Sequence, residues 1–88
     1  MVLTWDESKR LSNLDKHGLD FAALTPEFFE RATIYPARRG RLRAVGSLDR
    51  GTRWLTVVFA NLGTEGLSVV SMRFASKKER EDARKKTS

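Results

Sequence analysis

The chain has 88 residues, 40% hydrophobic and 32% charged, which predicts one small globular domain over residues 1–88 and excludes a doubly wound sheet or a large cofactor cradle. It has no cysteine, no secretion signal and no apolar stretch near about 18 residues, which argues against disulfides, thiolate metal sites, export and membrane spanning, so we expect a cytoplasmic protein. The formal net charge is +6, which favours a polyanionic partner such as nucleic acid over a merely basic surface.

The N-terminal part of the chain predicts a strand followed by a helix. Residues 2–5 are β-prone, and residues 6–18 form a polar helical stretch with Leu11 and Leu14 as its apolar stripe. A Thr-x-x-Glu capping box at residues 4–7 precedes this helix, and the glycine at its end favours termination there.

A second helical region is predicted over residues 20–30, but Pro26 interrupts it. The residue before a proline avoids helical dihedral angles, so the helix either begins here with Thr25 as its cap or is kinked. The aromatic residues expected in the core are Phe21, Phe28 and Phe59.

The rest of the chain predicts four strands and a final helix. The β-prone runs cover residues 32–35, 41–48, 53–60 and 67–74. A capping box at residues 76–79 opens the last helix. Short connections favour a mostly antiparallel sheet, so we expect an α+β fold in the order β-α-α-β-β-β-β-α, with the helices on one face.

The last helix has little with which to pack. Between residues 77 and 88 the one apolar residue is Ala83. We therefore expect this helix to be loosely held, frayed, or ordered only against a partner.

The basic charge is concentrated in the later part of the chain. Residues 1–30 have a net charge of −3, whereas residues 31–88 have a net charge of +9. The expected polyanion-binding surface therefore lies on the sheet and the last helix.

The first quarter of the chain carries a spaced signature of polar and aromatic residues. Its members are Trp5-Asp6-Glu7-Ser8-Lys9, Asn13, Lys16-His17-Gly18 and Phe21. This signature resembles the opening of the BrnT family, the toxin component of bacterial BrnT–BrnA type II toxin–antitoxin systems. The resemblance continues in order and at similar spacing through Arg41 and Gly46, residues 55–59 and residues 70–80.

The chain departs from the family pattern at three positions. Ala83 stands where a tyrosine is usual in the last helix, and Gly40 stands where an acidic residue often precedes the strand arginine. Pro26 interrupts a helix that is usually continuous in the family. The first departure removes the side chain on which any role of a terminal tyrosine would depend.

The resemblance implies a RelE-like fold and an endoribonuclease of the mRNA-interferase kind, which cleaves RNA without metal and inhibits translation. It also implies a cognate BrnA-like, DNA-binding antitoxin that neutralises the toxin. Operator DNA is then bound only through the antitoxin, in a higher-order toxin–antitoxin oligomer. No cofactor and no membrane partner are implied.

Metal-independent RNA cleavage uses the 2′-hydroxyl of the substrate as its nucleophile. The protein must then take up a proton, stabilise charge on the phosphate and protonate the leaving oxygen. One histidine and no cysteine argue against a metal nuclease, so no metal ligands are expected. The expected catalytic residues are His17, Arg41, Arg73, Lys16 and Glu79.

Several of these residues have an alternative interpretation. Histidine titrates near neutral pH, which makes His17 the natural acid or base. It fits equally well as a last-turn histidine that bonds free helix carbonyls. Arg41 and Arg73 are expected to point outward from the sheet and to grip phosphate. Glu79 either pairs with Arg73, acts as the base, or caps the last helix.

A wider set of side chains is expected to bind RNA: Lys9, Asn13, Arg43, Trp54, Lys77, Lys78 and Arg80. The first two share a helix face with Lys16, which predicts either a ridge that follows phosphates or a solvated helix face. Trp5, Tyr35 and Trp54 either stack unpaired bases or pack in the core.

The composition also fits a second class of function, a non-catalytic basic module that binds nucleic acid or a protein partner. The presence of Lys16, His17 and Arg73 favours the ribonuclease, because a pure binder has less need of them. No helix-turn-helix spacing is visible, which argues against a plain DNA-binding regulator. A neighbouring gene for a DNA-binding antitoxin would discriminate between these functions.

Overall fold

The computed structural model describes residues 1–87, and Ser88, the last residue of the predicted domain, lies outside the described residues. The elements are β1 (Val2–Trp5), α1 (Glu7–His17), η1 (Phe21–Ala23), α2 (Pro26–Arg31), β2 (Thr33–Pro36), η2 (Arg38–Gly40), β3 (Leu42–Ser47), β4 (Trp54–Leu62), β5 (Gly66–Phe74) and α3 (Lys77–Thr87). The two elements labelled η are single 3-10 turns. The fold is α+β, as the sequence predicts.

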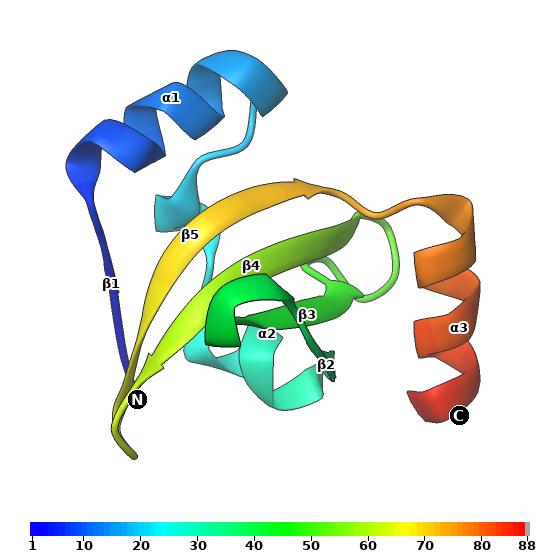
Figure 1. Cartoon of the computed structure of the whole chain (residues 1–88). Helices are drawn as coiled ribbons and strands as arrows, with labels where there is room; N and C mark the ends of the chain where they lie inside the picture. Colours follow the sequence, from blue (N-terminus) through cyan, green and yellow to red (C-terminus); the bar gives the residue numbers. More distant parts are fainter. Residues whose placement is uncertain (88) are drawn as a thin grey trace.

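The five strands form one sheet in the order β1-β5-β4-β3-β2 (Figure 1). Strands β2 to β5 are antiparallel neighbours, and β1 pairs in parallel with the first half of β5. The prediction of a mostly antiparallel sheet is therefore confirmed. The register places Val45 opposite Thr56, and Thr56 opposite Arg73, so these three side chains share one face.

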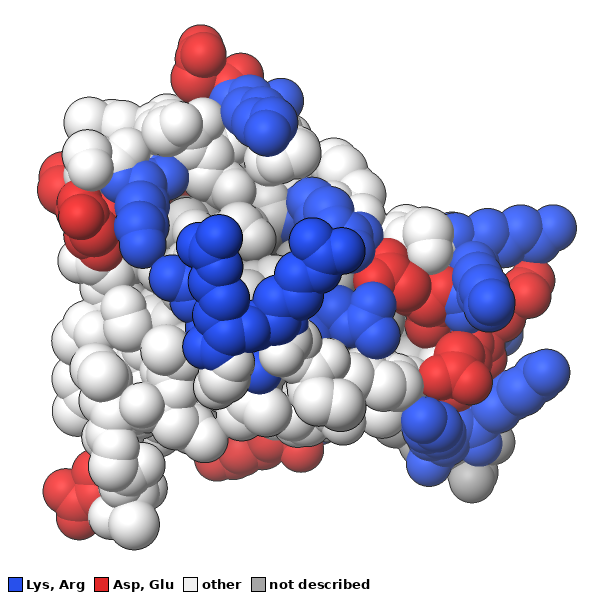
Figure 2. All heavy atoms as spheres, viewed as in Figure 1, with Lys and Arg blue, Asp and Glu red and all other residues white. Residues whose placement is uncertain are grey.

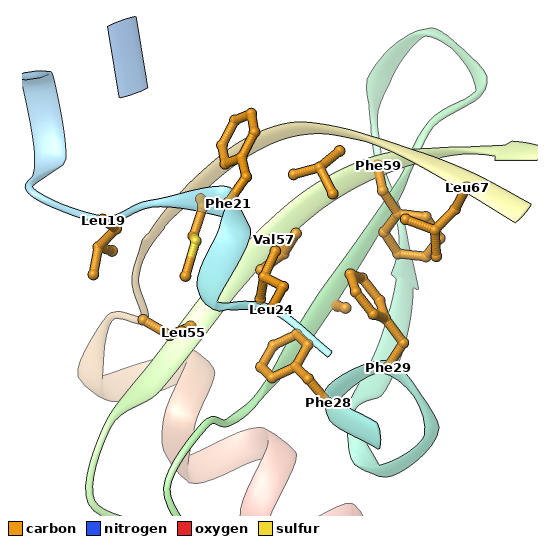
Figure 3. Close-up of a cluster of buried hydrophobic side chains, with 12 residues drawn as sticks. Leu19, Phe21, Leu24, Phe28, Phe29, Leu55, Val57, Phe59 and Leu67 are labelled. Carbon is orange, nitrogen blue, oxygen red and sulfur yellow. The ribbon is translucent and has the colours of Figure 1, made fainter. Parts of the chain in front are cut away.

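The hydrophobic core lies between one face of the sheet and the segment from η1 to α2 (Figure 3). The sheet contributes alternate residues of its central strands, because successive side chains of a strand point to opposite faces. The buried cluster is Leu19, Phe21, Leu24, Phe28, Phe29, Ala44, Leu55, Val57, Phe59, Leu67, Val69 and Met72. The predicted burial of Phe21, Phe28 and Phe59 is confirmed.

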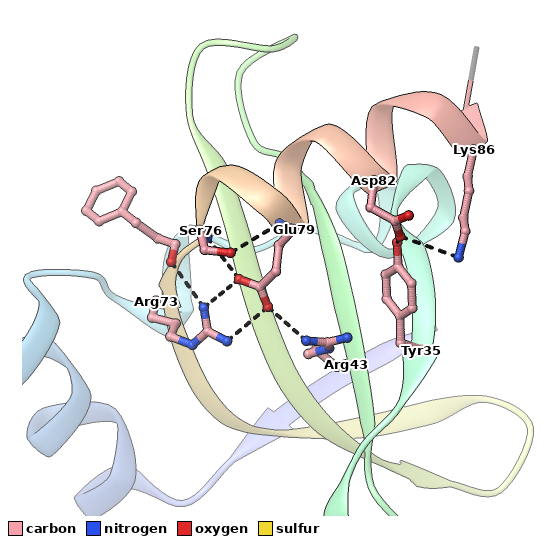
Figure 4. Close-up of polar contacts among 8 residues, drawn as sticks. Tyr35, Arg43, Arg73, Ser76, Glu79, Asp82 and Lys86 are labelled. Carbon is pink, nitrogen blue, oxygen red and sulfur yellow. Dashed lines mark hydrogen bonds and ion pairs between the residues drawn. The ribbon is translucent and has the colours of Figure 1, made fainter.

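Helix α3 covers the opposite face of the sheet, here called the outer face and defined by Arg43, Val45, Thr56, Ser71 and Arg73. Figure 3 shows α3 behind the sheet when the core is in front, and Figure 4 shows it in front when the outer face is viewed. The prediction that all helices lie on one face is therefore wrong. Apolar periodicity could not place α3, because this helix is almost wholly polar.

The prediction that α3 is loosely held is also wrong. Ala83 is fully buried, and Val45 and Thr56 on the outer face are 1% and 0% exposed. Polar contacts with β2, β3 and β5 supply the remaining attachment of the helix. The position where the family usually has a tyrosine is therefore a packing position in this chain.

Helix α1 lies against β5 through a polar rather than an apolar residue. Leu11 and Leu14 are 53% and 37% exposed, so the predicted apolar stripe faces solvent, whereas Asn13 is buried. The helix cap is Asp6, which accepts a hydrogen bond from the Ser8 N–H at 2.9 Å, rather than the predicted capping box.

Helix α2 begins at Pro26, and Thr25 is its cap, the first of the two predicted alternatives. The helix comes very close to β3 at Gly46. A Cβ atom built on Gly46 would lie 3.1 Å from Ala32 Cβ and 3.4 Å from the Phe28 ring. Glycine at this position therefore allows the two layers of the core to meet.

Candidate functional site

Two arginines of the outer face share one carboxylate of α3 (Figure 4). Arg73 Nη1 and Nη2 donate to Glu79 Oε1 and Oε2 at 2.8 and 3.0 Å, and Arg43 Nη1 donates to Oε2 at 2.9 Å. The three groups together carry a net positive charge. We call Arg43, Arg73 and Glu79 the arginine cluster.

The capping box predicted for α3 fixes the carboxylate of this cluster. The Ser76 N–H donates to Glu79 Oε1 at 2.9 Å, and the Glu79 N–H donates to Ser76 Oγ at 3.1 Å. The Arg73 hydrogen bonds, opposed by burial and aided by Ser76, lower the pKa of Glu79 to about 2. Glu79 is therefore ionised at neutral pH, and it both pairs with Arg73 and caps the helix, as two of its predicted roles require.

The arginine cluster presents its positive groups to solvent more than its negative one. The side chains of Arg73 and Arg43 are 42% and 33% exposed, whereas that of Glu79 is 13% exposed. An arriving anion therefore meets guanidinium groups whose orientation is already fixed by a covered carboxylate. Such preorganised donors suit the developing charge of a phosphate in a transition state.

Tyr35 lies beside the arginine cluster and is fully engaged. Its hydroxyl donates to Asp82 Oδ2, and its ring lies 4.8 Å from the Arg43 guanidinium carbon and 4.4 Å from Lys86 Nζ (Figure 4). Burial and the Asp82 carboxylate raise the pKa of Tyr35 to about 12. The Tyr35 ring therefore already contacts two cationic groups, which compete with the predicted stacking of a base on it.

A second group of predicted residues surrounds a hollow between α1 and β5. Lys9, Lys16 and His17 line it together with Ser71, and its volume is about 400 Å³. Ser71 and Arg73 are alternate residues on the outer face, so their Cα atoms lie about 7 Å apart. We call Lys9, Lys16 and His17 the histidine group; their hollow reaches β5 at Ser71, two residues before Arg73 of the arginine cluster.

His17 occupies the last position of α1. Gly18 follows in the left-handed conformation, and its N–H donates to the Leu14 carbonyl at 2.8 Å. Within residues 1–87 the imidazole of His17 makes no hydrogen bond to a helix carbonyl, so the alternative of a carbonyl-bonding histidine is not supported.

Asn13 is placed differently from the other predicted RNA contacts. It is 7% exposed, and its amide nitrogen donates to the carbonyls of Leu19 at 3.0 Å and Met72 at 2.9 Å. Its amide oxygen accepts from the Met72 N–H at 3.0 Å. Both amide hydrogens are therefore used by the backbone, and we leave Asn13 out of the candidate RNA surface.

The other predicted residues surround the arginine cluster or lie at the sheet end. Lys78 lines a hollow of about 300 Å³ with Arg43 and Glu79. Arg41 is half-buried immediately before β3, and Lys77 is exposed at the first residue of α3. Trp54 and Arg80 line a separate hollow at one end of the sheet.

The charged side chains are gathered as the sequence predicts. Figure 2 shows Lys and Arg grouped over the middle of one face and again along α3, where Asp and Glu lie among them. Within residues 1–87, no three His, Cys, Asp or Glu side chains are arranged to hold a metal ion. No helix of that part of the chain is long and apolar enough to cross a bilayer.

Sequence reasoning missed Ser71 and Asp82. Ser71 could have been found, because strand alternation places it on the same face as Arg73. Asp82 lies three residues after Glu79, which predicts the same helix face, but its partner Tyr35 is distant in sequence.

Comparison with known proteins finds a matching family model and a similar solved structure. Residues 5–79 match the family model described as the ribonuclease toxin BrnT of type II toxin–antitoxin systems. The chain is also similar to the crystal structure of the Brucella abortus ribonuclease toxin BrnT, with 46% sequence identity and a TM-score of 0.79, over 88% of this chain and 100% of that one. Among curated proteins no match is found.

Proposed function

The chain belongs to the BrnT family of ribonuclease toxins of type II toxin–antitoxin systems, and from that premise we propose that it is a metal-independent endoribonuclease that inhibits translation by cleaving messenger RNA. The observation that carries the proposal is the arginine cluster, with two guanidinium groups oriented by one carboxylate. His17, at the end of α1, lines a hollow with Ser71, which lies two residues before Arg73 on β5.

In the proposed reaction the 2′-hydroxyl of a nucleotide attacks the adjacent phosphorus. The new 2′-O–P bond forms as the P–O5′ bond breaks, which leaves a 2′,3′-cyclic phosphate and a 5′-hydroxyl. Arg73 and Arg43 stabilise the additional negative charge on the phosphate oxygens. The 2′-hydroxyl loses a proton and O5′ gains one; His17 either accepts the first or donates the second, and water exchanges the other. Lys16 beside it adds positive charge.

Glu79 has a positioning role in this reaction rather than that of a base. With its pKa lowered to about 2, it is a weak proton acceptor at neutral pH. Its two carboxylate oxygens instead hold both arginines in the orientation that phosphate binding requires.

The remaining basic residues extend the surface on which RNA would lie. Lys9 belongs to the histidine group, whereas Lys77 and Lys78 lie at the start of α3. Arg41 precedes β3, and alternation places it on the same face as Arg43. Such contacts to phosphates are independent of sequence and weaken with salt.

The antitoxin is proposed to be a BrnA-like DNA-binding protein that covers this basic surface in the cytoplasm. A protein inhibitor of such a surface needs acidic side chains that compete with phosphate for Arg73 and Arg43. Operator DNA would then be bound only through the antitoxin, in a higher-order complex of the two proteins.

The test is cleavage of RNA by the purified protein in the presence of a metal chelator. We expect cleavage products that end in a 2′,3′-cyclic phosphate, and loss of cleavage in Arg73→Ala. Arg31→Ala, which removes an exposed arginine of α2, is the matched control and should cleave normally. Cleavage that requires magnesium, or that survives in Arg73→Ala, would refute the proposed chemistry.

A second candidate function is RNA binding without turnover. It is favoured by the same arginine cluster, because a held pair of arginines binds phosphate whether or not a reaction follows. Tight binding of RNA with no cleavage by the wild-type protein would select this function.

A further inference from the structure

A hollow of about 530 Å³ at one end of the sheet is separate from the arginine cluster and from the histidine group. We call it the end pocket. It is bounded by the turn that leads into β4, by the last residue of β5 and by the first two turns of α3. Its lining residues are Gly51, Thr52, Arg53, Trp54, Phe74, Ala75, Arg80 and Arg84.

Two aromatic side chains line the end pocket. Phe74 is 56% exposed, whereas the other four phenylalanines of the chain are all buried in the core. Trp54 is half-buried, and its carbonyl accepts from the Ala75 N–H at 2.9 Å, which ties the two aromatic segments together. The hollow therefore offers a flat apolar surface to a planar ligand, exposed at Phe74 and half-buried at Trp54.

The charge around these aromatic residues is positive. Three arginines line the end pocket, and none of the described residues that line it is acidic. Arg53 is held by Asp49 outside the lining, at 2.5 Å between Nε and Oδ2. A ligand that suits the pocket is therefore both planar and anionic, which describes a nucleotide better than an apolar or acidic peptide segment.

We propose that the end pocket binds a nucleotide of single-stranded RNA beyond the two that flank the cleaved phosphate, with the base against Phe74, beside Trp54, and its phosphate on Arg80. This inference rests on the proposed function, since it assigns a subsite to the same substrate. Arg73 and Phe74 are consecutive residues, so their Cα atoms are about 3.8 Å apart. An RNA strand held at Arg73 thus reaches the pocket within one or two nucleotides.

Tryptophan fluorescence tests the inference without requiring catalysis. The chain has two tryptophans, and Trp5 packs edge-on against Phe21 with ring centroids 6.2 Å apart. In a Trp5→Phe variant the emission reports on Trp54 alone. A short 2′-O-methyl oligonucleotide cannot be cleaved, because its 2′-hydroxyl is blocked, and we expect it to quench this emission saturably.

Phe74→Ala in the same background should raise the dissociation constant for that oligonucleotide by about tenfold, the loss typical of one base–aromatic contact. Leu62→Ala, which truncates a side chain of similar exposure at the far end of β4, is the control and should bind normally. Unchanged Trp54 emission, or equal affinity of the Phe74→Ala and control variants, would overturn the inference.

Cleavage separates a failure of the end pocket from a failure of the proposed function. We expect Phe74→Ala to lower kcat/KM about tenfold on an RNA long enough to fill the pocket, and to leave cleavage of a dinucleotide unchanged. Equal loss on both substrates would assign Phe74 to the fold instead. Quenching of Trp54 emission by the 2′-O-methyl oligonucleotide, with no cleavage of unmodified RNA, would support the end pocket as a binding site. It would refute the proposed ribonuclease function.

Discussion

Asn13 of α1 and Met72 of β5 are joined by a pair of hydrogen bonds that takes the place of a missing strand. The Met72 N–H donates to Asn13 Oδ1, and Asn13 Nδ2 donates to the Met72 carbonyl. Strand β1 pairs with β5 only as far as Val69, so the edge of β5 would otherwise be open at Met72. One side-chain amide thus closes the sheet edge and attaches the helix that carries His17.

Replacing Asn13 by alanine should therefore destabilise the protein more than a typical helix substitution. The variant loses three hydrogen bonds, which at usual net values amount to about 2–3 kcal/mol of unfolding free energy. Urea unfolding measures this loss. Ser12→Ala, one residue earlier and exposed, is the control, and a loss no larger than that of the control would contradict the role of Asn13.

The Glu79 carboxyl should make stability depend on pH in the acid range. Its pKa is lowered to about 2 in the folded protein, so its contribution is complete above the ordinary value near 4.5 and is lost as pH falls from there to about 2. We expect about 1–2 kcal/mol after allowance for solvent screening.

The free energy of unfolding, measured between pH 4.5 and about 2 for the wild type and Glu79→Gln, tests this loss of stability. The loss should be absent from the variant. Glu81→Gln, at an exposed position of the same helix, should behave like the wild type. An acid-range slope that persists in Glu79→Gln would assign the effect to other carboxyls.

His17→Ala should lower the single-turnover rate of RNA cleavage by about 10²–10⁴-fold, the usual loss on removal of a general acid or base. Its ring is half-buried at the end of α1 and lines the hollow beside Ser71 rather than the hydrophobic core, so stability should change little. Leu14→Ala, one turn earlier in α1, is the control for the helix itself. A His17→Ala enzyme with wild-type rate would remove the histidine from the mechanism.

The single tyrosine provides a direct spectroscopic measurement of the contact between α3 and β2. Burial and Asp82 raise the pKa of Tyr35 to about 12, so the folded protein should resist tyrosine ionisation until well above the ordinary value of 10. Alkaline difference absorbance gives the midpoint. Asp82→Asn should lower that midpoint toward 10, and an unchanged midpoint would show that burial alone is responsible.

Because the folded protein favours the neutral form of Tyr35, this residue also stabilises the fold over a defined pH range. A raised pKa means that the contribution is complete below pH 10 and disappears as pH rises toward about 12. Stability should therefore fall in this range in the wild type and fall less in Asp82→Asn.

Gly46→Ala should destabilise the protein through overpacking rather than through backbone strain. The added methyl group would lie 3.1 Å from Ala32 Cβ and 3.2 Å from Ala32 Cα, which is closer than ordinary contact. We expect a loss of about 1–3 kcal/mol in urea unfolding. Ala44→Gly is not a suitable control for overpacking. Gly51→Ser would probe the other effect, backbone strain, because Gly51 has a φ of 98°. A neutral Gly46→Ala would show that α2 can shift away from β3.

Much of the fold could be predicted, because local chemistry determines its elements. The proline after Thr25 limits where α2 can begin, and the Ser76–Glu79 spacing identifies the start of α3. The arginine on the outer face follows from strand alternation at Arg73. These features depend on neighbours in sequence, which is the information that a single chain contains.

The remaining features depend on partners that are distant in sequence. Asn13 is polar and lies on a polar helix, so nothing local indicates that it is buried against Met72. In the same way, α3 has a single apolar residue, and its place on the outer face depends on Arg43 and Tyr35. Polar attachments of this kind leave no hydrophobic periodicity to detect.

The parallel pairing of β1 with β5 gives the protein an order of assembly. Val2 lies opposite Gly66, so this contact closes the longest loop among the strand pairs, and long loops close late. The antiparallel strands can form first and bring the arginines together, whereas α1 arrives with β1 and delivers His17 last. Recovery of cleavage during refolding should therefore lag behind recovery of the circular dichroism signal.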